Sequence, residues 1–235
     1  MTRRFAALFA LLALVVAAQA PAAETWTEGK NYFVVTPPQR TSVPPGKVEV
    51  TEVFSYGCPY CYQTQGFITK LKASLPPNAQ LVYLPASFIP RENWPMFQRA
   101  FFAAQALGIL EKTHAAMFDA VWKTGELGIS DPATNRLKSR MPTIEDAAKF
   151  YARVGGVTPE AFIAAANSFS VDAKMRAADA TVVGAQALST PTFLVNGKYR
   201  LNADTAGSYD KLIELVKFLV AKEAAAAPKA SAAKS

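Results

Sequence analysis

Two cysteines stand where a strand-like segment meets a helix-like one, and this junction restricts the possible folds more than any other feature. Residues 47–56 are rich in β-branched and aromatic side chains and follow Pro-Pro-Gly, which predicts a strand. Residues 59–75 carry apolar side chains at helical spacing, which predicts a helix. Cys58 then falls at the N-cap, and Pro59 takes the first helical position, where proline fits best. Cys61 follows one turn later on the same side, at a separation that allows a disulfide.

Four kinds of site compete to explain this cysteine pair. A zinc site needs four ligands, and the only histidine, His114, lies far away in an Ala-rich segment. Haem attachment requires a histidine directly after the second cysteine, where Tyr62 stands. A structural disulfide would close a very short loop and constrain the unfolded chain little. The helix N-terminus, in contrast, stabilises a thiolate at Cys58. The pattern therefore predicts a redox-active disulfide, with no metal and no other cofactor.

The first residues have the pattern of a secretory signal peptide. Arg3 and Arg4 precede an apolar run over residues 5–16, and small residues follow at positions 20–22. The run is too short to span a bilayer as a retained anchor. We therefore expect residues 1–22 to be removed on export, with cleavage after Ala22 or Ala23. The formal charge of +7 is spread along the chain without dense basic blocks, so no nucleic-acid partner is expected.

The remaining elements predict an α/β fold with a helical insertion. Residues 32–35 and 80–88 are strand candidates, and Asn196-Gly197 is a strong turn signal for a hairpin between residues 192–195 and 198–201. Amphipathic or Ala-rich helices are predicted over residues 96–107, 111–123, 143–154, 159–167 and 171–187. A closing helix is predicted over residues 210–222, and the Ala-rich segment after it is expected to be a disordered tail.

Two sequence blocks carry a family resemblance. FSYGCPYCYQ, followed far downstream by STPTFLVNGKYRL, resembles the DsbA family of bacterial periplasmic thiol–disulfide oxidases. The resemblance implies a thioredoxin fold with an inserted α-helical subdomain. It divides the chain into a first thioredoxin-fold half (residues 23–90), the helical insertion (91–187), a second half (188–222) and a tail (223–235).

The resemblance also implies roles for the residues around the disulfide. Cys58 is expected to be the attacking and attacked sulfur, and Cys61 the buried resolving one. Pro191 is expected to follow a cis peptide bond and face the disulfide, and Thr190 to pair through its backbone with an extended substrate. Pro59 and Tyr60 are expected to lie against that substrate. From the residues alone, an ordinary trans loop before the hairpin remains the alternative for Thr190-Pro191.

Glu52 is the candidate proton carrier. It shares the apolar face of the predicted strand with Val48, Val50 and Phe54. Burying a carboxylate on such a face costs free energy unless the group has a polar partner or a catalytic role. By resemblance, it takes the place of a buried acid that relays the proton of the second cysteine. The alternative is a glutamate at the edge of the sheet whose carboxylate reaches solvent.

Three positions depart from well-studied members of the family. Tyr60 stands where they carry His, and Gln65 and Tyr83 stand where some carry Glu and Lys. A favourable charge near Cys58 is therefore absent, and we expect a redox potential less oxidising than the family's extreme. His114 is interpreted as a packing or helix-surface residue.

The predicted function is that of a periplasmic thiol:disulfide oxidase. It would donate the Cys58–Cys61 disulfide to reduced secreted proteins through a mixed disulfide at Cys58. By resemblance, a quinone-linked membrane partner of the DsbB type would reoxidise it, and a monomer is expected. The alternatives are a reductase or isomerase of the same compartment, or a peptide-binding thioredoxin-fold module. Too few residues precede the first core strand for the dimerisation domain that isomerases of this kind carry.

Overall fold

The computed structural model describes residues 25–226, so the predicted signal peptide lies outside the described residues. The elements, in chain order, are β1 (Phe33–Val34), β2 (Val48–Phe54), α1 (Pro59–Gln63), α2 (Gln65–Ser74), β3 (Ala79–Pro85), the 3-10 turn η1 (Pro90–Glu92), α3 (Trp94–Ala106), α4 (Leu110–Trp122), α5 (Ile144–Gly155), α6 (Pro159–Ala166), α7 (Phe169–Gly184), β4 (Thr192–Val195), β5 (Tyr199–Leu201), α8 (Ala203–Ala206) and α9 (Tyr209–Ala226). No helix among these residues is long and apolar enough to cross a membrane.

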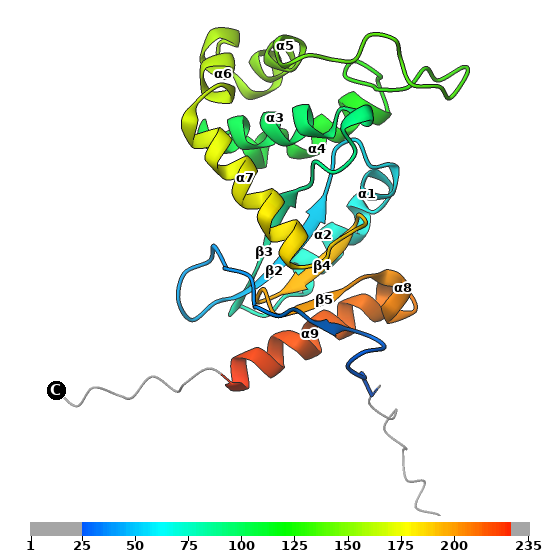
Figure 1. The fold of residues 1–235 in the computed structure, drawn as a ribbon, viewed down its shortest axis with the longest axis vertical. Helices are drawn as coiled ribbons and strands as arrows, with labels where there is room; N and C mark the ends of the chain where they lie inside the picture. Colours follow the sequence, from blue (N-terminus) through cyan, green and yellow to red (C-terminus); the bar gives the residue numbers. More distant parts are fainter. Residues whose placement is uncertain (1–24, 227–235) are drawn as a thin grey trace, which may run out of the picture.

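A five-stranded mixed sheet forms one half of the molecule, with strand order β1-β5-β4-β2-β3 (Figure 1). β2 runs parallel to β3 and antiparallel to β4, and all seven of its residues are buried. The central place of β2 explains its apolar, β-branched sequence, because both of its faces are covered. Its carboxyl end leads directly into the cysteine motif.

Two core clusters hold the molecule together. Val48 and Val50 of β2 pack with side chains of α2 and α9 on one side of the sheet. Phe54, at the end of β2, belongs to the larger cluster that includes the inserted helices, where its ring meets Phe101 edge-on at 5.5 Å. The end of β2 therefore lies at the junction of the sheet and the insertion.

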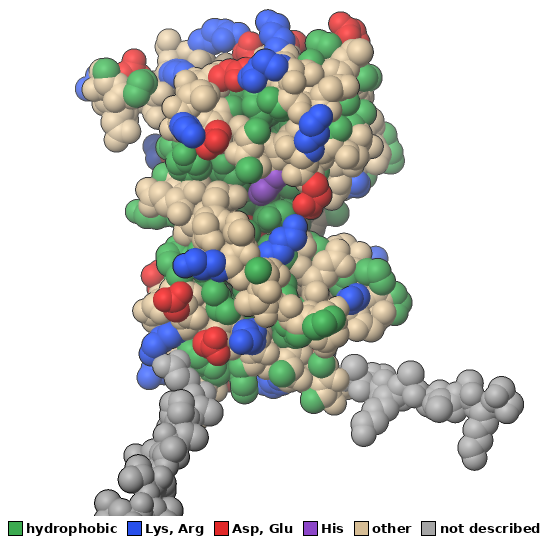
Figure 2. Space-filling view, turned by 180° about the vertical axis from the view of Figure 1, so that it is seen from behind, with side chains coloured by type: hydrophobic (Ala, Val, Ile, Leu, Met, Phe, Trp, Pro, Cys, Tyr) green, Lys and Arg blue, Asp and Glu red, His purple; other side chains and the backbone are tan. Residues whose placement is uncertain are grey.

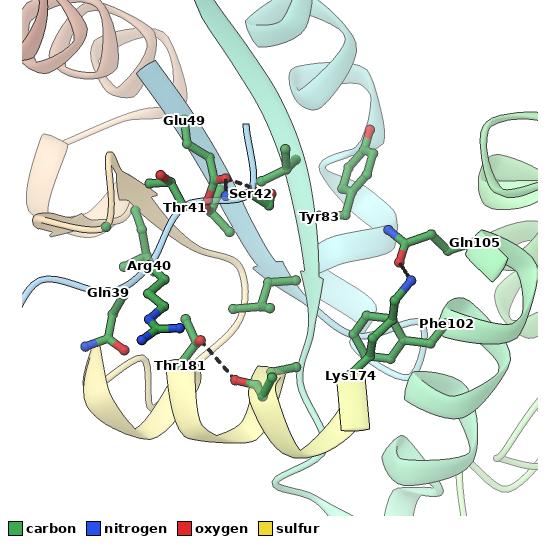
Figure 3. Close-up of a pocket in the computed structure, with 17 residues that line it drawn as sticks. Gln39, Arg40, Thr41, Ser42, Glu49, Tyr83, Phe102, Gln105, Lys174 and Thr181 are labelled. Atoms are coloured by element: carbon green, nitrogen blue, oxygen red, sulfur yellow. Dashed lines mark hydrogen bonds between the residues drawn. The ribbon is translucent and has the colours of Figure 1, made fainter. Parts of the chain in front are cut away.

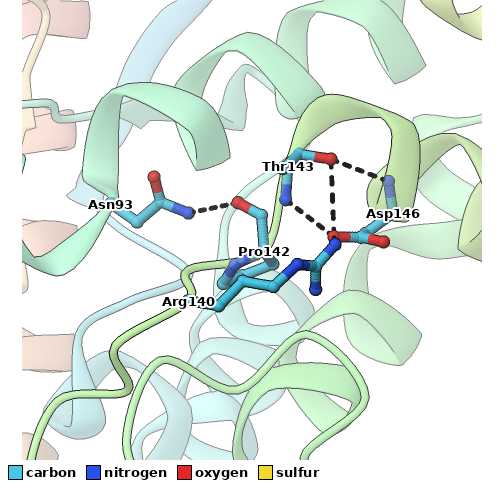
Figure 4. A network of polar contacts seen from close by, with 5 residues as sticks. All are labelled: Asn93, Arg140, Pro142, Thr143 and Asp146. Atoms are coloured by element: carbon cyan, nitrogen blue, oxygen red, sulfur yellow. Dashed lines mark hydrogen bonds and ion pairs between the residues drawn. The ribbon is translucent and has the colours of Figure 1, made fainter.

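Five helices, α3 to α7, form the insertion, and each matches a predicted helical segment (Figure 1). The loop between α4 and α5 is fixed to this layer by polar contacts (Figure 4). Thr143 and Asp146 form a capping box at the start of α5, Arg140 pairs with Asp146 at 2.9 Å, and Asn93 donates to the carbonyl of Pro142. Such reciprocal caps satisfy backbone amides that a helix start leaves free.

The single helix predicted over residues 59–75 is wrong, because the structure breaks it at Thr64 into α1 and α2. The carbonyl of Cys61 accepts hydrogen bonds from the Thr64 hydroxyl at 3.2 Å and the Gln65 side-chain amide at 3.0 Å. Side chains that take over a backbone acceptor in this way interrupt the helical ladder. The short α1 thus carries the cysteine motif on its own.

The predicted start of the tail at residue 223 is also wrong, because α9 continues to Ala226. Glu223 is 5% exposed and accepts hydrogen bonds from Lys198 at 2.6 Å and from Asn196 at 2.5 Å. The β4–β5 turn therefore fixes the last turn of α9 through a buried carboxylate. Residues 227–235 lie outside the described residues.

Candidate active site

The N-terminus of α1 positions the two cysteines. Cys58 is the N-cap residue, with extended backbone angles (φ −90°, ψ 117°), and Pro59 follows at the first helical turn. The backbone N–H of Cys61 points at the Cys58 Sγ across 3.4 Å. Both cysteines are free thiols, with Cys58 3% exposed and Cys61 fully buried. The helix start therefore directs a backbone amide that has no acceptor within the helix at the sulfur of Cys58.

The two thiols differ in acidity. A hydrogen bond from the Cys61 thiol, helped by Thr190 and by the amides of Cys61 and Tyr60, lowers the pKa of Cys58 to about 6, although burial opposes the shift. Burial, together with the hydrogen bond and charge of Cys58 and the charge of Glu52, raises the pKa of Cys61. At neutral pH, Cys58 is therefore the thiolate and Cys61 remains protonated.

Glu52 lies inside the protein with no polar partner among the described residues. Its side chain is fully buried, and neither carboxylate oxygen has a hydrogen bond. Burial, with a further contribution from the charge of Cys58, raises its pKa to about 8. Because β2 is an inner strand, the alternative of a glutamate at the sheet edge is wrong. Glu52 is therefore a buried acid that is protonated at neutral pH.

The loop before β4 faces the cysteines. The Thr190–Pro191 peptide bond is cis, as the resemblance implied, and the thiol of Cys58 lies 3.5 Å from the carbonyl oxygen of Thr190. Beside this loop a pocket of about 420 Å³ is lined by Tyr60, Ser189, Thr190, Pro191, Asn202, Ala203, Asp204 and Tyr209. The Tyr60 side chain is 63% exposed. The pocket therefore brings the helix start at Tyr60 and the cis-proline loop to one place beside Cys58.

Comparison with known proteins agrees with this geometry. No family model matches the chain. The thiol:disulfide interchange protein DsbA of Pseudomonas aeruginosa PAO1 is 33% identical over 223 residues, which cover 94% of this chain and 98% of the relative. The DsbA of Azotobacter vinelandii is 32% identical over 198 residues, or 84% of this chain and 85% of the relative.

This chain belongs to the DsbA family. A crystal structure of Pseudomonas aeruginosa DsbA matches with a TM-score of 0.72 and 33% identity over 87% of this chain and 97% of that one. The DsbA oxidoreductase of Xylella fastidiosa matches with a TM-score of 0.72 and 28% identity, over 84% and 97% of the two chains. The fold is thus a thioredoxin fold with an inserted helical domain, and the chain is a thiol:disulfide oxidoreductase.

This DsbA-family site includes residues that the sequence did not reveal. Asn202, Asp204 and Tyr209 line the pocket beside Thr190, although they come from the end of the hairpin, α8 and the start of α9. No motif or spacing connects these residues with the cysteines. Only the tertiary fold of the second half brings them to one pocket with Tyr60 of α1.

His114 lies at the junction of the sheet and the insertion of this DsbA-family fold. It is 7% exposed, its Nδ1 lies 2.7 Å from the Tyr56 hydroxyl, and its ring packs 4.3 Å from that of Tyr83. Burial, and then the charge of Lys72, lowers its pKa to about 3. Figure 2 shows this side chain, drawn in purple, largely covered by its neighbours. The described residues hold no cluster of three or more His, Cys, Asp or Glu side chains that could bind a metal.

A second cavity, of about 340 Å³, lies between the sheet and α7 (Figure 3). Glu49 in its wall accepts hydrogen bonds from the backbone and hydroxyl of Ser42 and from the hydroxyl of Thr51. Lys174 donates to Gln105 at 2.8 Å on the opposite side. Neither cysteine lines this cavity, so it is separate from the redox site of the DsbA family.

Proposed function

We propose that this protein is a thiol:disulfide oxidase that is exported across the inner membrane and gives its Cys58–Cys61 disulfide to newly secreted proteins in the periplasm. The observation that carries the proposal is the difference in acidity between the two thiols. A stabilised thiolate at Cys58 favours the reduced form, and a disulfide whose reduced form is stabilised is a strong oxidant.

The reaction follows from this asymmetry. A substrate thiolate attacks the Cys58 sulfur, the Cys58–Cys61 bond breaks, and Cys61 leaves with the electron pair. Glu52, protonated at neutral pH, transfers its proton to the buried Cys61 thiolate. A second substrate thiolate then attacks the substrate sulfur of the mixed disulfide and releases Cys58 as the thiolate. The substrate loses two electrons, and the protein gains them as the Cys58 thiolate and the Cys61 thiol. Glu52 is left as the carboxylate and regains its proton from the solvent.

Residues beside Cys58 position the substrate in this proposal. The backbone of Thr190, ahead of Pro191, pairs with an extended substrate chain, as in recognition by strand addition. Pro59, which is exposed, and Tyr60, which lines the pocket, form the other side of the approach. No cofactor other than the disulfide takes part. The protein acts as a monomer, and a membrane partner of the DsbB type, linked to quinone, removes the electrons.

The test is the redox equilibrium of the chain without residues 1–22 in glutathione buffers. We expect a potential between the values of DsbA and protein disulfide isomerase, which are about −120 and −180 mV. The absence of a histidine at position 60 places it below the DsbA value. A potential near that of thioredoxin, about −270 mV, would contradict the oxidase and favour a reductase.

A further inference from the structure

One face of α4 lies against the cysteine motif. His114, Phe118 and Trp122 are four residues apart, so their side chains lie along the same face of this helix. This face meets Tyr56 and Tyr62, the two tyrosines that flank the segment from Gly57 to Cys61. A helix of the insertion thus contacts the chain on both sides of the redox pair.

Tyr56, on the strand side, is held at its backbone and at its hydroxyl. The indole Nε1–H of Trp122 donates to the carbonyl oxygen of Tyr56 at 2.8 Å. The hydroxyl of Tyr56 lies 2.7 Å from the Nδ1 of His114, and its ring meets that of Phe118 edge-on at 4.9 Å. The carbonyl bond matters most, because it fixes the orientation of the peptide that leads into Gly57 and Cys58.

Tyr62, on the helix side, is held by the same part of α4. Its ring stacks on that of Trp122, with 6.4 Å between the centroids and an angle of 19° between the planes. Its hydroxyl donates to Asp119 at 3.4 Å. Trp122 therefore contacts the chain just before the motif through its N–H and just after it through its ring.

We propose that Trp122 is a positioning residue for thiol–disulfide exchange, which holds the Cys58 Sγ against the first amides of α1 and thereby sets how strongly oxidising the disulfide is. The backbone N–H of Cys61 lies 3.4 Å from this sulfur. It stabilises the negative charge of the Cys58 thiolate only while the N–H points at the sulfur. The reduced form carries that charge and the oxidised form does not. Contacts of Trp122 that improve this alignment therefore stabilise the reduced form and not the oxidised form. The inference rests on the proposed role of Cys58 as the reacting thiolate.

Trp94 provides a matched control. It is also a buried tryptophan of the insertion, and its indole lies so close to the backbone of Gly57 that an added Cβ there would come within 2.7 Å of the Nε1. Its Nε1 has no hydrogen-bond partner among the described residues. Trp94→Phe thus removes packing beside the motif without removing a hydrogen bond to it.

The experiment compares the mature protein with its Trp122→Phe and Trp94→Phe variants. For each, the Cys58 pKa is followed by thiolate absorbance, and the redox equilibrium is measured against glutathione. We expect Trp122→Phe to raise the Cys58 pKa and to shift the equilibrium roughly threefold to tenfold toward the oxidised protein, the factor by which a weakened hydrogen bond from the Cys61 amide would destabilise the Cys58 thiolate. Trp94→Phe is expected to lower stability but to leave both quantities near their original values.

A third variant separates the hydrogen bond from the ring. Trp122→Gln keeps an N–H donor without the indole, so its potential should lie nearer that of the original protein than Trp122→Phe does. Unchanged values in Trp122→Phe, equal shifts in Trp94→Phe, or a Gln variant no nearer the original would each overturn the inference. If Trp122→Phe does not fold, Tyr62→Leu removes the stacking partner and is expected to shift the equilibrium in the same direction.

The oxidase proposal is tested separately, by the Cys58 pKa of the protein without substitutions. A Cys58 with the ordinary pKa of a thiol in that protein would contradict the oxidase proposal. An acidic Cys58 that does not respond to Trp122→Phe would contradict only the role of Trp122.

Discussion

The thiol of Cys58 lies 3.5 Å from the carbonyl oxygen of Thr190, although 132 residues separate them in the chain. The insertion accounts for most of that separation, and the two thioredoxin-fold halves on either side of it close around the sulfur. A substrate strand paired with the backbone of Thr190 would be delivered directly to Cys58. Cys61 is fully buried, whereas 3% of Cys58 remains exposed.

The two cysteines are expected to give opposite results when they are replaced. Cys58→Ser should abolish oxidation of a reduced, unfolded test protein, because no mixed disulfide forms without the Cys58 sulfur. In Cys61→Ser, a mixed disulfide at Cys58 should accumulate, because the resolving thiol is gone. Mass spectrometry of the adducts decides the roles, and adducts carried by Cys61 in Cys58→Ser would reverse them.

The acidity of Cys58 predicts how the stability of the reduced form depends on pH. A folded pKa of about 6, below the ordinary 9.0, contributes stability that is full above pH 9 and disappears as pH falls through 6. At pH 7 the contribution is about 1.4 kcal/mol, since one pH unit above the folded pKa corresponds to that amount. Cys61, with its raised pKa, contributes nothing at this pH.

Denaturant unfolding of the reduced protein between pH 5 and 9 tests this expectation, with the oxidised protein as the control that has no thiol to titrate. The free energy of unfolding of the reduced form should rise relative to that of the oxidised form across this range. Parallel pH profiles for the two forms would show that Cys58 has an ordinary pKa.

Glu52→Gln is expected to stabilise the protein at neutral pH. The raised pKa of Glu52 means that the unfolded state loses its proton from pH 4.5 upward, whereas the folded state keeps it until about pH 8. Glu52 therefore lowers the free energy of unfolding by an amount that grows as the pH rises from 4.5 to 8, and that is roughly 3 kcal/mol at pH 7. The variant should lose this penalty, and its advantage should vanish below pH 4.5. At the same time, thiol exchange near neutral pH should slow by about tenfold or more without the proton carrier.

Glu49→Gln is the matched control on the same strand. The Glu49 carboxylate accepts bonds from Ser42 and Thr51, so its loss should destabilise the protein by about 1.5–3 kcal/mol. Chemical denaturation across pH 4 to 8 compares the two variants, with thiol exchange measured by stopped flow. A Glu52→Gln protein with the pH profile of the original chain would mean that the carboxylate reaches water.

The buried end of α9 is expected to contribute to stability. Glu223→Gln weakens charge-assisted bonds to Lys198 and Asn196 and should cost about 1.5–3 kcal/mol. Glu214→Gln on the same helix is the control, because its pair with Lys217 is long, at 3.8 Å, and exposed, and such pairs contribute about 0–1 kcal/mol. Thermal unfolding compares them, and equal midpoints in the two variants would place Glu223 in solvent.

Sequence alone determined the features of this protein that depend on neighbouring residues. The strand before Cys58, the proline at the helix start and the hairpin turn at Asn196-Gly197 follow from local backbone preferences, and both turn residues indeed have positive φ angles, 52° and 65°. The apolar periodicity of the insertion likewise predicted its five helices. These features also carried the family resemblance.

Only the tertiary structure decided the partners of buried polar groups. It left the carboxylate of Glu52 without a hydrogen bond to any residue from 25 to 226, extended α9 so that Glu223 meets Lys198, and brought Trp122 to the carbonyl of Tyr56. Each case depends on atoms contributed by elements distant in the chain. Local propensity and periodicity describe how a segment folds but not which segment it packs against, so the sequence predicted the redox pair but not the partners of these buried groups.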